Sequence, residues 1–320
     1  MSTLLDKTTR VPQTSRRVWR ETRLMMERAE VRATPVGRRH RNWNIFTTLI
    51  ALFGVSLRIL GLYRRGVRNA VDIRLTRLDL RFETLPKEFD GFRLLQLSDL
   101  HVDFLPETLQ AALDLIDDIE ADVCVLTGDF KKRVRGPFEQ ILPAMSELAS
   151  RIAVPHGTFA ILGNHDTAEM VEPFEAMGIR VLANETHTIQ KGRARLHLTG
   201  TDDVHYYYTD AARRALAAAP EGFKIALIHS AEFADGAADN GYDLYLAGHT
   251  HGGQVCLPGG SPIITHLTRF RRYGRGLWRH GDMQGYTSTG VGVSGLPVRF
   301  NSRGEVALIT LRAAAAAPRR

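Results

Sequence analysis

The sequence predicts an α/β fold with buried sheets, and three observations lead to this prediction. Apolar runs of strand length recur from residue 93 onward. Helical patterns such as 106–119 and 138–151 lie between them, and strands that alternate with helices are typical of layered α/β domains. Five of these runs are followed by a polar residue of a type that can bind a metal. The runs are 93–97, 123–127, 158–162, 196–199, 224–228, 244–247 and 306–311.

The first 44 residues differ in composition from the rest of the chain. They hold eleven basic and four acidic residues, so this basic arm carries the whole net charge of +7. Weak helical periodicity over 17–31 predicts one short helix in the arm. From residue 88 onward there are 28 acidic and 23 basic residues, which argues against a nucleic-acid partner. The two cysteines, Cys124 and Cys256, are too few for a disulfide framework.

An apolar stretch over 45–63 follows the arm, and Arg58 is its single charged residue. Its nineteen residues approach the roughly 20 that a helix needs to span a bilayer. An arginine inside the bilayer is costly, so a helix on the membrane surface and a helix packed on the domain are the alternatives to a spanning helix. We therefore expect the protein at a membrane, the bacterial inner membrane, with the side of the globular domain left open.

The rest of the chain divides into three parts. A connecting segment covers 64–88 and contains an alternating stretch, 71–83, that predicts a strand. The globular domain is expected over 89–312, and 313–320 is interpreted as a tail. The arginine pair at 16–17 resembles a twin-arginine export signal but lies far from the apolar stretch, so export stays an open alternative.

The polar residues after the strands are the candidate functional residues. Parallel strands of an α/β sheet end at one edge, where loops bring their side chains together around a ligand. Asp and His are residue types that bind borderline divalent metals. An isolated Asp-x-His is usually a solvated loop, but five such blocks in series, each after an apolar run, indicate a metal site. The candidate ligands are Asp99, His101, Asp129, Asn164, His229, His249 and His251.

The spacing of these residues adds detail. In an extended Asp-x-His or His-x-His the two side chains point to the same side and can hold one ion. Glycines 128, 163 and 248 immediately precede ligands, where a missing Cβ permits a sharp turn and close approach of the backbone. The other histidines match no ligand block and are expected to be surface or packing residues: His40, His156, His187, His197, His205, His266 and His280.

The five blocks resemble the signature of the calcineurin-like metallophosphoesterases, D-x-H, G-D, G-N-H-[DE], H and G-H-x-H. All five are intact in this chain, and the resemblance covers about 89–311. It implies a sandwich of two mixed β-sheets flanked by helices, here preceded by the basic arm and the apolar helix. It also implies two divalent metal ions, Mn, Fe or Zn. The resemblance divides the ligands between two ions with one bridge: Asp99, His101 and His251; Asn164, His229 and His249; and Asp129 as the bridge.

The implied activity is hydrolysis of a phosphate ester by in-line attack of a hydroxide that bridges the metals. His165 is not a ligand by this resemblance, which leaves it to stabilise the transition state or to protonate the leaving group. Asp166 is then the natural partner to orient a histidine. The sequence after Asp129, Phe130-Lys131-Lys132, departs from the patterns of Ser/Thr protein phosphatases and purple acid phosphatases.

The string Gly-His-Thr-His-Gly-Gly-Gln at 248–254 looks like one bacterial subgroup of this family. That subgroup includes phosphodiesterases similar to those acting on lipid-linked diphosphates, and it often carries an N-terminal membrane segment. We therefore expect a phosphodiester or diphosphate substrate in a lipid headgroup or nucleotide-sugar lipid. The alternatives are a phosphodiesterase on soluble nucleotides and a non-catalytic metal-binding scaffold. The oligomeric state is not indicated.

Overall fold

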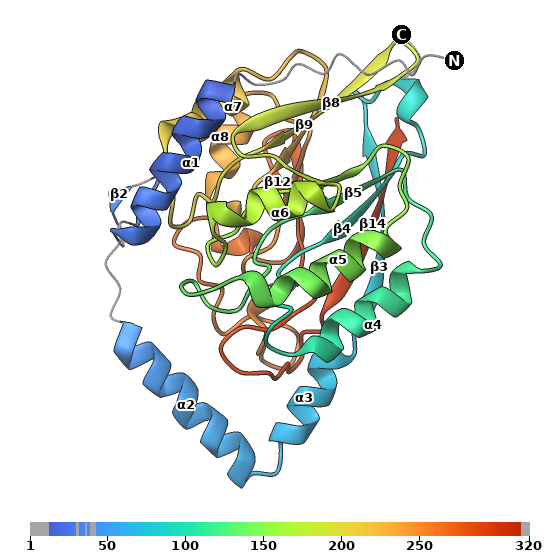
Figure 1. The fold of residues 1–320 in the computed structure, drawn as a ribbon. Coiled ribbons are helices and arrows are strands. Elements are labelled where there is room, and N and C mark those ends of the chain that lie inside the picture. The colour runs from blue at the N-terminus through green and yellow to red at the C-terminus, as the bar shows by residue number, and fades with distance from the viewer. Residues whose placement is uncertain (1–12, 30–31, 36, 39–42, 315–320) are drawn as a thin grey trace.

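The computed structural model describes residues 13–29, 32–35, 37–38 and 43–314, and it shows two stacked sheets between layers of helices (Figure 1). Each sheet has six strands. The first sheet runs in the order β3 (Arg74–Phe82), β14 (Glu305–Ala313), β4 (Arg93–Leu97), β5 (Val123–Leu126), β6 (Thr158–Ala160) and β7 (Ile179–Val181). The second runs β12 (Gly276–His280), β13 (Met283–Thr287), β11 (Leu244–Ala247), β10 (Phe223–Leu227), β9 (Ala194–Gly200) and β8 (Glu185–Lys191).

Both sheets are mixed, as the resemblance implied. In the first sheet β4, β5, β6 and β7 are parallel, and β14 pairs antiparallel with β4. In the second sheet β9, β10, β11 and β13 are parallel, and the edge strands β8 and β12 are antiparallel to their neighbours. Every strand predicted from an apolar run is present. The predicted α/β fold is therefore confirmed.

Apolar runs form the central strands because each strand is covered on both faces. In β5, Val123 and Val125 belong to the core between the two sheets, whereas Cys124 and Leu126 belong to the core beneath the helices. A strand buried on both faces favours apolar side chains along its length. Most of the polar residues that could bind a ligand therefore lie beyond its ends.

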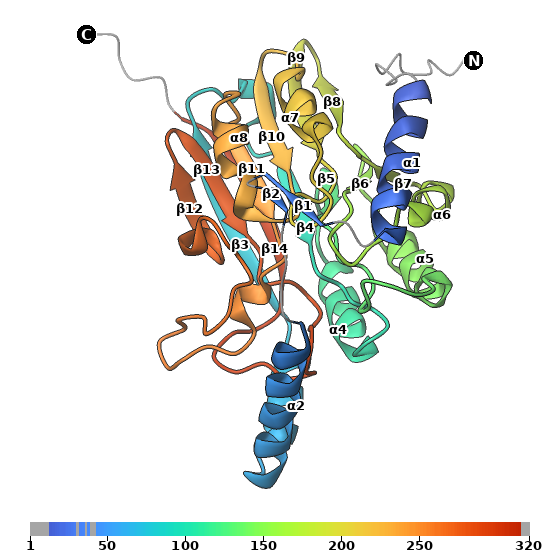
Figure 2. The ribbon, with the colours of Figure 1, turned by 90° about the vertical axis from the view of Figure 1, so that its left-hand side faces the viewer.

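Helices cover the outer faces of both sheets (Figures 1 and 2). The outer face of the first sheet packs against α4 (Pro106–Ile116), α5 (Leu142–Arg151) and α6 (Val171–Ala176). The outer face of the second packs against α7 (Asp210–Ala217) and α8 (Ala234–Ala238). The helices predicted over 106–119 and 138–151 are confirmed as α4 and α5.

The helix predicted in the basic arm is α1 (Gln13–Arg28). It is not a detached arm, because Trp19 is buried in the same core as α4 and α5. Figure 2 shows α1 beside α6 and β7. Two short strands, β1 (Ala33–Thr34) and β2 (Gly37–Arg38), follow it, and β1 lies against Tyr207.

The apolar stretch does not form one continuous helix. Residues 45–59 of the stretch lie in α2 (Trp43–Ile59), and only Tyr63 lies in α3 (Tyr63–Val71); the two helices form a hairpin, in which α3 adjoins the domain and α2 stands away from it (Figure 1). At 17 residues, α2 is about 25 Å long, less than the roughly 30 Å of a bilayer core. No helix in the described ranges is long and apolar enough to cross a membrane. The expected spanning helix over 45–63 is therefore not found.

The segment expected to connect this stretch to the domain contributes to the sheet itself. The strand predicted within 71–83 is β3, which pairs in parallel with β14 along nine residues. The first sheet therefore begins at Arg74, before the expected domain start at residue 89. Most of the expected tail, 315–320, and the arm residues 1–12 lie outside the described residues.

Candidate metal centre

The candidate ligands all lie at the carboxyl ends of parallel strands. Asp99 and His101 follow β4, Asp129 follows β5, and Asn164 follows β6 in the first sheet. In the second sheet, His229 follows β10, and the pair 249 and 251 follows β11. Because the two sheets face each other, these loops meet at one edge of the sandwich. The seven predicted ligands are brought together there, and each is almost fully buried.

Six of the seven form two clusters with the spacing of metal ligands. Within each, one donor atom per residue lies within 4.8 Å of the others. In the first cluster the Nε2 atoms of His101 and His251 are 3.2 Å apart, and Nε2 of His251 is 3.5 Å from Oδ1 of Asp99. The clusters are Asp99, His101 and His251, and Asp129, His229 and His249. Asp129 therefore falls in the second cluster by spacing.

Asp129 nevertheless faces both clusters. Its Oδ2 lies 3.3 Å from Nε2 of His229 and 3.8 Å from Nε2 of His101, one residue from each cluster. The same oxygen is 4.0 Å from Nε2 of His165. This central place is the one that a bridging carboxylate needs.

The donor atoms fit a divalent metal. Among the described residues, Oδ1 of Asn164 and both ring nitrogens of His249 are buried without a hydrogen-bond partner, which is costly unless a ligand supplies one. His101 donates from Nδ1 to the Lys131 carbonyl (2.8 Å), and His229 donates from Nδ1 to the Thr127 carbonyl (2.7 Å). These bonds leave Nε2 of each ring as a lone-pair donor directed into the centre.

The backbone around the ligands is tightly packed and conformationally unusual. Added Cβ atoms would clash with Oδ1 of Asp129 at Gly163 and with Oδ2 of Asp99 at Gly248, as the glycine positions predicted. Asp99, His101, Asp129, His249 and His251 all have positive φ, between 39° and 71°. The extended geometry expected for the two paired motifs is therefore wrong. A left-handed residue is unfavourable away from glycine and tends to persist at functional sites.

Burial and charge separate the protonation states of the centre. Burial, followed by repulsion from neighbouring histidines, lowers the pKa of His101 to about 4 and that of His249 and His251 well below the usual value. Burial would also lower the pKa of His229, but Asp129 raises it to about 10. Burial would raise the pKa of Asp129, but the charges of His229 and other histidines lower it well below its usual value. The centre therefore combines the Asp129 carboxylate and a protonated His229 with neutral imidazoles at His101, His249 and His251, and a divalent ion held by Nε2 of His229 would replace its proton.

His165 and Asp166 occupy different surroundings. The His165 side chain is 18% exposed, unlike the buried His101 and His229, and its Nδ1 donates to the Lys132 carbonyl. Asp166 is buried, and its carboxylate accepts backbone N–H groups from Asp129, Phe130 and Gly163 at 2.7–2.8 Å. Asp166 thus holds two ligand loops together, and the structure gives it this role instead of the expected orientation of a histidine.

Sequence reasoning missed a buried pair beside the ligands. The ring of His205 lies 4.1 Å from that of His249, and its Nδ1 donates to Oε2 of Glu232 at 2.6 Å. Asp203 accepts the backbone N–H of His205 (3.0 Å). A signal was available, because residues 201–205 follow the predicted strand 196–199 just as the ligands follow theirs. Glu232 had no comparable signal.

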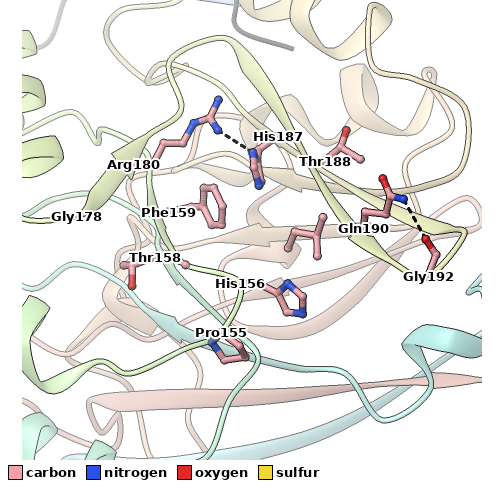
Figure 3. A pocket seen from close by; sticks show the side chains of 12 residues that line it. Pro155, His156, Thr158, Phe159, Gly178, Arg180, His187, Thr188, Gln190 and Gly192 are labelled. Atoms are coloured by element: carbon pink, nitrogen blue, oxygen red, sulfur yellow. Dashed lines mark hydrogen bonds between the residues drawn. The ribbon is translucent and has the colours of Figure 1, made fainter. Parts of the chain in front are cut away.

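A hollow of about 660 Å³ lies away from the centre (Figure 3). It is lined by residues at or before the beginnings of β6 and β7, including His156 and Arg180, and by His187 on β8. The ligands follow the opposite ends of parallel strands. The hollow therefore belongs to a different edge of the molecule.

Comparison with known proteins agrees with the site. The sequence model of the family described as Calcineurin-like phosphoesterase matches residues 92–253, which include all seven predicted ligands. The uncharacterized metallophosphoesterase YkuE of Bacillus subtilis is 30% identical, over 75% of this chain and 86% of its own. Phosphodiesterase YaeI of Escherichia coli is 32% identical, over 69% of this chain and 82% of its own length. A transmembrane protein with metallophosphoesterase domain from Danio rerio is 26% identical, over 84% of this chain and 62% of its own length.

The sequence blocks that follow the strands meet in one buried centre, and the family match spans all seven candidate ligands. The chain belongs to the calcineurin-like phosphoesterase family and is a hydrolase acting on phosphoric ester bonds.

Proposed function

We propose that the protein uses two divalent ions to hydrolyse a phosphodiester or diphosphate, and that its substrate is part of a lipid. The central place of Asp129 is the observation that carries the two-ion scheme. One carboxylate oxygen stands within 4.0 Å of histidines from both clusters, which suits a bridge between two ions. Asp99, His101 and His251 would hold one ion, and His229, His249 and Asn164 the other.

The ions would lower the pKa of a bound water and neutralise charge on the phosphoryl oxygens. The chain itself supplies His165, whose Nδ1 is fixed by the Lys132 carbonyl so that Nε2 is directed toward the centre. Nε2 can donate a hydrogen bond to a phosphoryl oxygen or a proton to the leaving oxygen. The His165 N–H donates to Oδ1 of Asp129 at 2.9 Å, which holds the residue beside the bridge.

A lipid substrate is supported by the α2–α3 hairpin, which exposes many apolar side chains to solvent. A contiguous group of exposed apolar residues is unusual on a soluble surface and marks an interaction site. Arg64, Arg65 and Arg68 adjoin this group on α3, a pattern suited to anionic headgroups. The exposed residues are Leu49, Leu52, Phe53, Val55, Ile59, Leu60 and Leu62.

Arg299 connects the hairpin to the metal centre. Arg299 donates its backbone N–H to the Gly66 carbonyl on α3 at 2.9 Å. Its guanidinium is buried and donates to the His251 carbonyl at 3.1 Å. A hairpin lying on a membrane would hold the centre close to that membrane, within reach of a headgroup. YaeI is named a phosphodiesterase and the Danio rerio relative a transmembrane protein, which agrees with this proposal.

Hydrolysis assays on the full chain test the proposal. Metal-stripped protein is reloaded with manganese and given bis-p-nitrophenyl phosphate, a nucleotide-sugar lipid in detergent micelles, a phospholipid and a soluble dinucleotide. We expect manganese-dependent hydrolysis, with the lipid-linked substrate preferred over the soluble one. A preference for the soluble dinucleotide would overturn the lipid assignment. Two bound metals with no hydrolysis of any substrate would overturn the enzymatic proposal and favour a scaffold.

A further inference from the structure

The helix α1 carries an arginine that is buried beside the metal centre although it lies outside the matched family region. The Arg23 side chain has 0% exposure. Its Nη2 donates to the carbonyls of Gly163 (3.2 Å) and Asp166 (2.8 Å). Those residues flank Asn164 and His165. One guanidinium group therefore forms hydrogen bonds with both ends of the segment that supplies a candidate ligand and the proposed catalytic histidine.

A second nitrogen of Arg23 joins this segment to the opposite sheet. Nη1 donates to Asp202, in the loop after β9, and Trp19 donates from Nε1 to the second oxygen of that carboxylate at 2.7 Å. Asp202 also accepts the Asp203 N–H at 2.8 Å, and Asp203 in turn holds the backbone of His205. Arg23 therefore links the loop of one sheet to the loop of the other across the edge that holds the metals.

A second contact from α1 secures the same segment further along. Arg23 donates from Nε to Oε1 of Glu27 at 2.9 Å. The Glu27 carboxylate accepts from Oγ1 of Thr167 (2.6 Å) and from the Ala168 N–H (3.1 Å). Residues 163–168 are thus bound to α1 at both ends.

We propose that Arg23 is a positioning residue that sets where Asn164 and His165 stand relative to the metal centre. The inference rests on the proposed function, because it gives those two residues a part in the reaction. A guanidinium is suited to this task since its donors are held in a rigid plane and its charge does not change with pH. A displacement of about 1 Å at a reacting group can cost on the order of 100-fold in rate.

Two substitutions separate positioning from ordinary stabilisation. Arg23→Lys keeps the charge opposite Asp202 but lacks the planar fork that reaches both carbonyls. Arg23→Ala removes the charge and the planar fork together. We expect kcat to fall about tenfold in Arg23→Lys and about 100-fold in Arg23→Ala, with KM nearly unchanged. Arg17→Ala is the matched control, because Arg17 lies on the same helix with its side chain 73% exposed.

Rescue by guanidinium ion gives a readout that a purely structural role would not produce. Guanidinium at low millimolar concentration should restore part of kcat to folded, manganese-loaded Arg23→Ala and leave Arg17→Ala unaffected. Hydrogen exchange should become faster in 163–168 in Arg23→Lys. A wild-type kcat for Arg23→Lys, or a drop explained entirely by lost protein or lost metal, would overturn the inference.

A further variant keeps the test decisive where both Arg23 variants do not fold. Glu27→Ala removes the hydrogen bonds from Thr167 and Ala168 to α1, and the Glu27 side chain is partly exposed. This variant should lower kcat severalfold at constant metal content. An unchanged kcat in that variant would count against positioning from α1. Wild-type protein assayed in parallel separates the two hypotheses, since an inactive wild type refutes the proposed function and only the variant-to-wild-type ratio concerns Arg23.

Discussion

At the scale of single residues, the centre is defined by which buried groups have partners. Ring nitrogens of His249 and the Asn164 oxygen are left for a metal, whereas the Asp166 carboxylate is fully used by backbone N–H groups. His165 is the partly exposed histidine among these buried ligands. A group that meets a substrate must reach solvent, and a group that holds a metal need not.

We expect His165→Ala to lower kcat by about 10²- to 10⁴-fold, because general acid and transition-state contributions of a histidine have this size. Metal content, measured by elemental analysis of the purified protein, should stay near two per chain. His156→Ala is the control, since His156 lies at the opposite edge of the molecule. Loss of both metals from His165→Ala would show that His165 is a structural part of the centre.

The buried Glu232 makes stability depend on pH. Burial alone would raise its pKa, but hydrogen bonds from His205 and Thr268 lower it from 4.5 to about 2. A lowered carboxyl pKa contributes stability above pH 4.5 that is lost as pH falls toward 2, here about 3 kcal/mol. Glu232→Gln should therefore lose most of this amount in urea unfolding at pH 7 and less than half at pH 3.

The control for this measurement is Glu169→Gln, because Glu169 is exposed. Its free energy of unfolding should follow wild type at both pH values. An equal destabilisation of Glu232→Gln at pH 7 and pH 3 would mean that lost packing, and not the carboxylate charge, accounts for the effect.

At the scale of elements, strands inside apolar or regularly alternating runs were predictable, and β7, β8, β12 and β13 were not. Runs such as 93–97 and 244–247 became strands with unchanged bounds. In contrast, β8 has the sequence Glu-Thr-His-Thr-Ile-Gln-Lys and is covered on one face only, so its sequence resembles that of a polar loop. The strand β7 has three residues, too few for any periodicity. Such elements form because their neighbours supply hydrogen bonds.

The proposed membrane contact depends on the α2–α3 hairpin. We expect the double variant Leu52→Ser and Ile59→Ser to bind vesicles of phosphatidylethanolamine and phosphatidylglycerol at least about tenfold more weakly in a flotation assay. Burying each of these side chains in lipid should contribute roughly 1.5–3 kcal/mol. Leu277→Ser, at an exposed leucine of β12, should bind like wild type. Vesicle binding equal to wild type in the double variant would refute the hairpin as the contact.

At the scale of the whole molecule, the centre ties the two sheets together. Ligands come from three strands of one sheet and two of the other, so metals bound between them would oppose separation of the sheets. Among the described residues, this edge holds buried ring nitrogens of His229, His249 and His251 and the Asn164 amide oxygen without hydrogen-bond partners. Stability of the whole fold should therefore depend on metal.

We expect chelation to lower the melting temperature by several degrees and manganese to restore it. A ligand at 100 times its dissociation constant adds about 2.7 kcal/mol, and each kcal/mol shifts Tm by about 2–4 °C in a domain of this size. Differential scanning fluorimetry measures the shift, and Asp129→Ala should show little response to manganese. A wild-type Tm indifferent to both treatments would contradict a metal centre shared by the sheets.

The sequence by itself determined the candidate ligands and their place at strand ends. Strand-length apolar runs and the polar residue after each are local features, and parallel strands must end at a common edge. It could not determine the backbone conformation of these loops or which distant segments pack against them. The left-handed backbone of Asp99 and His249, the use of Asp166 by backbone N–H groups and the docking of Arg23 all depend on contacts between distant segments. Periodicity carries no record of such contacts, so the tertiary structure alone decided them.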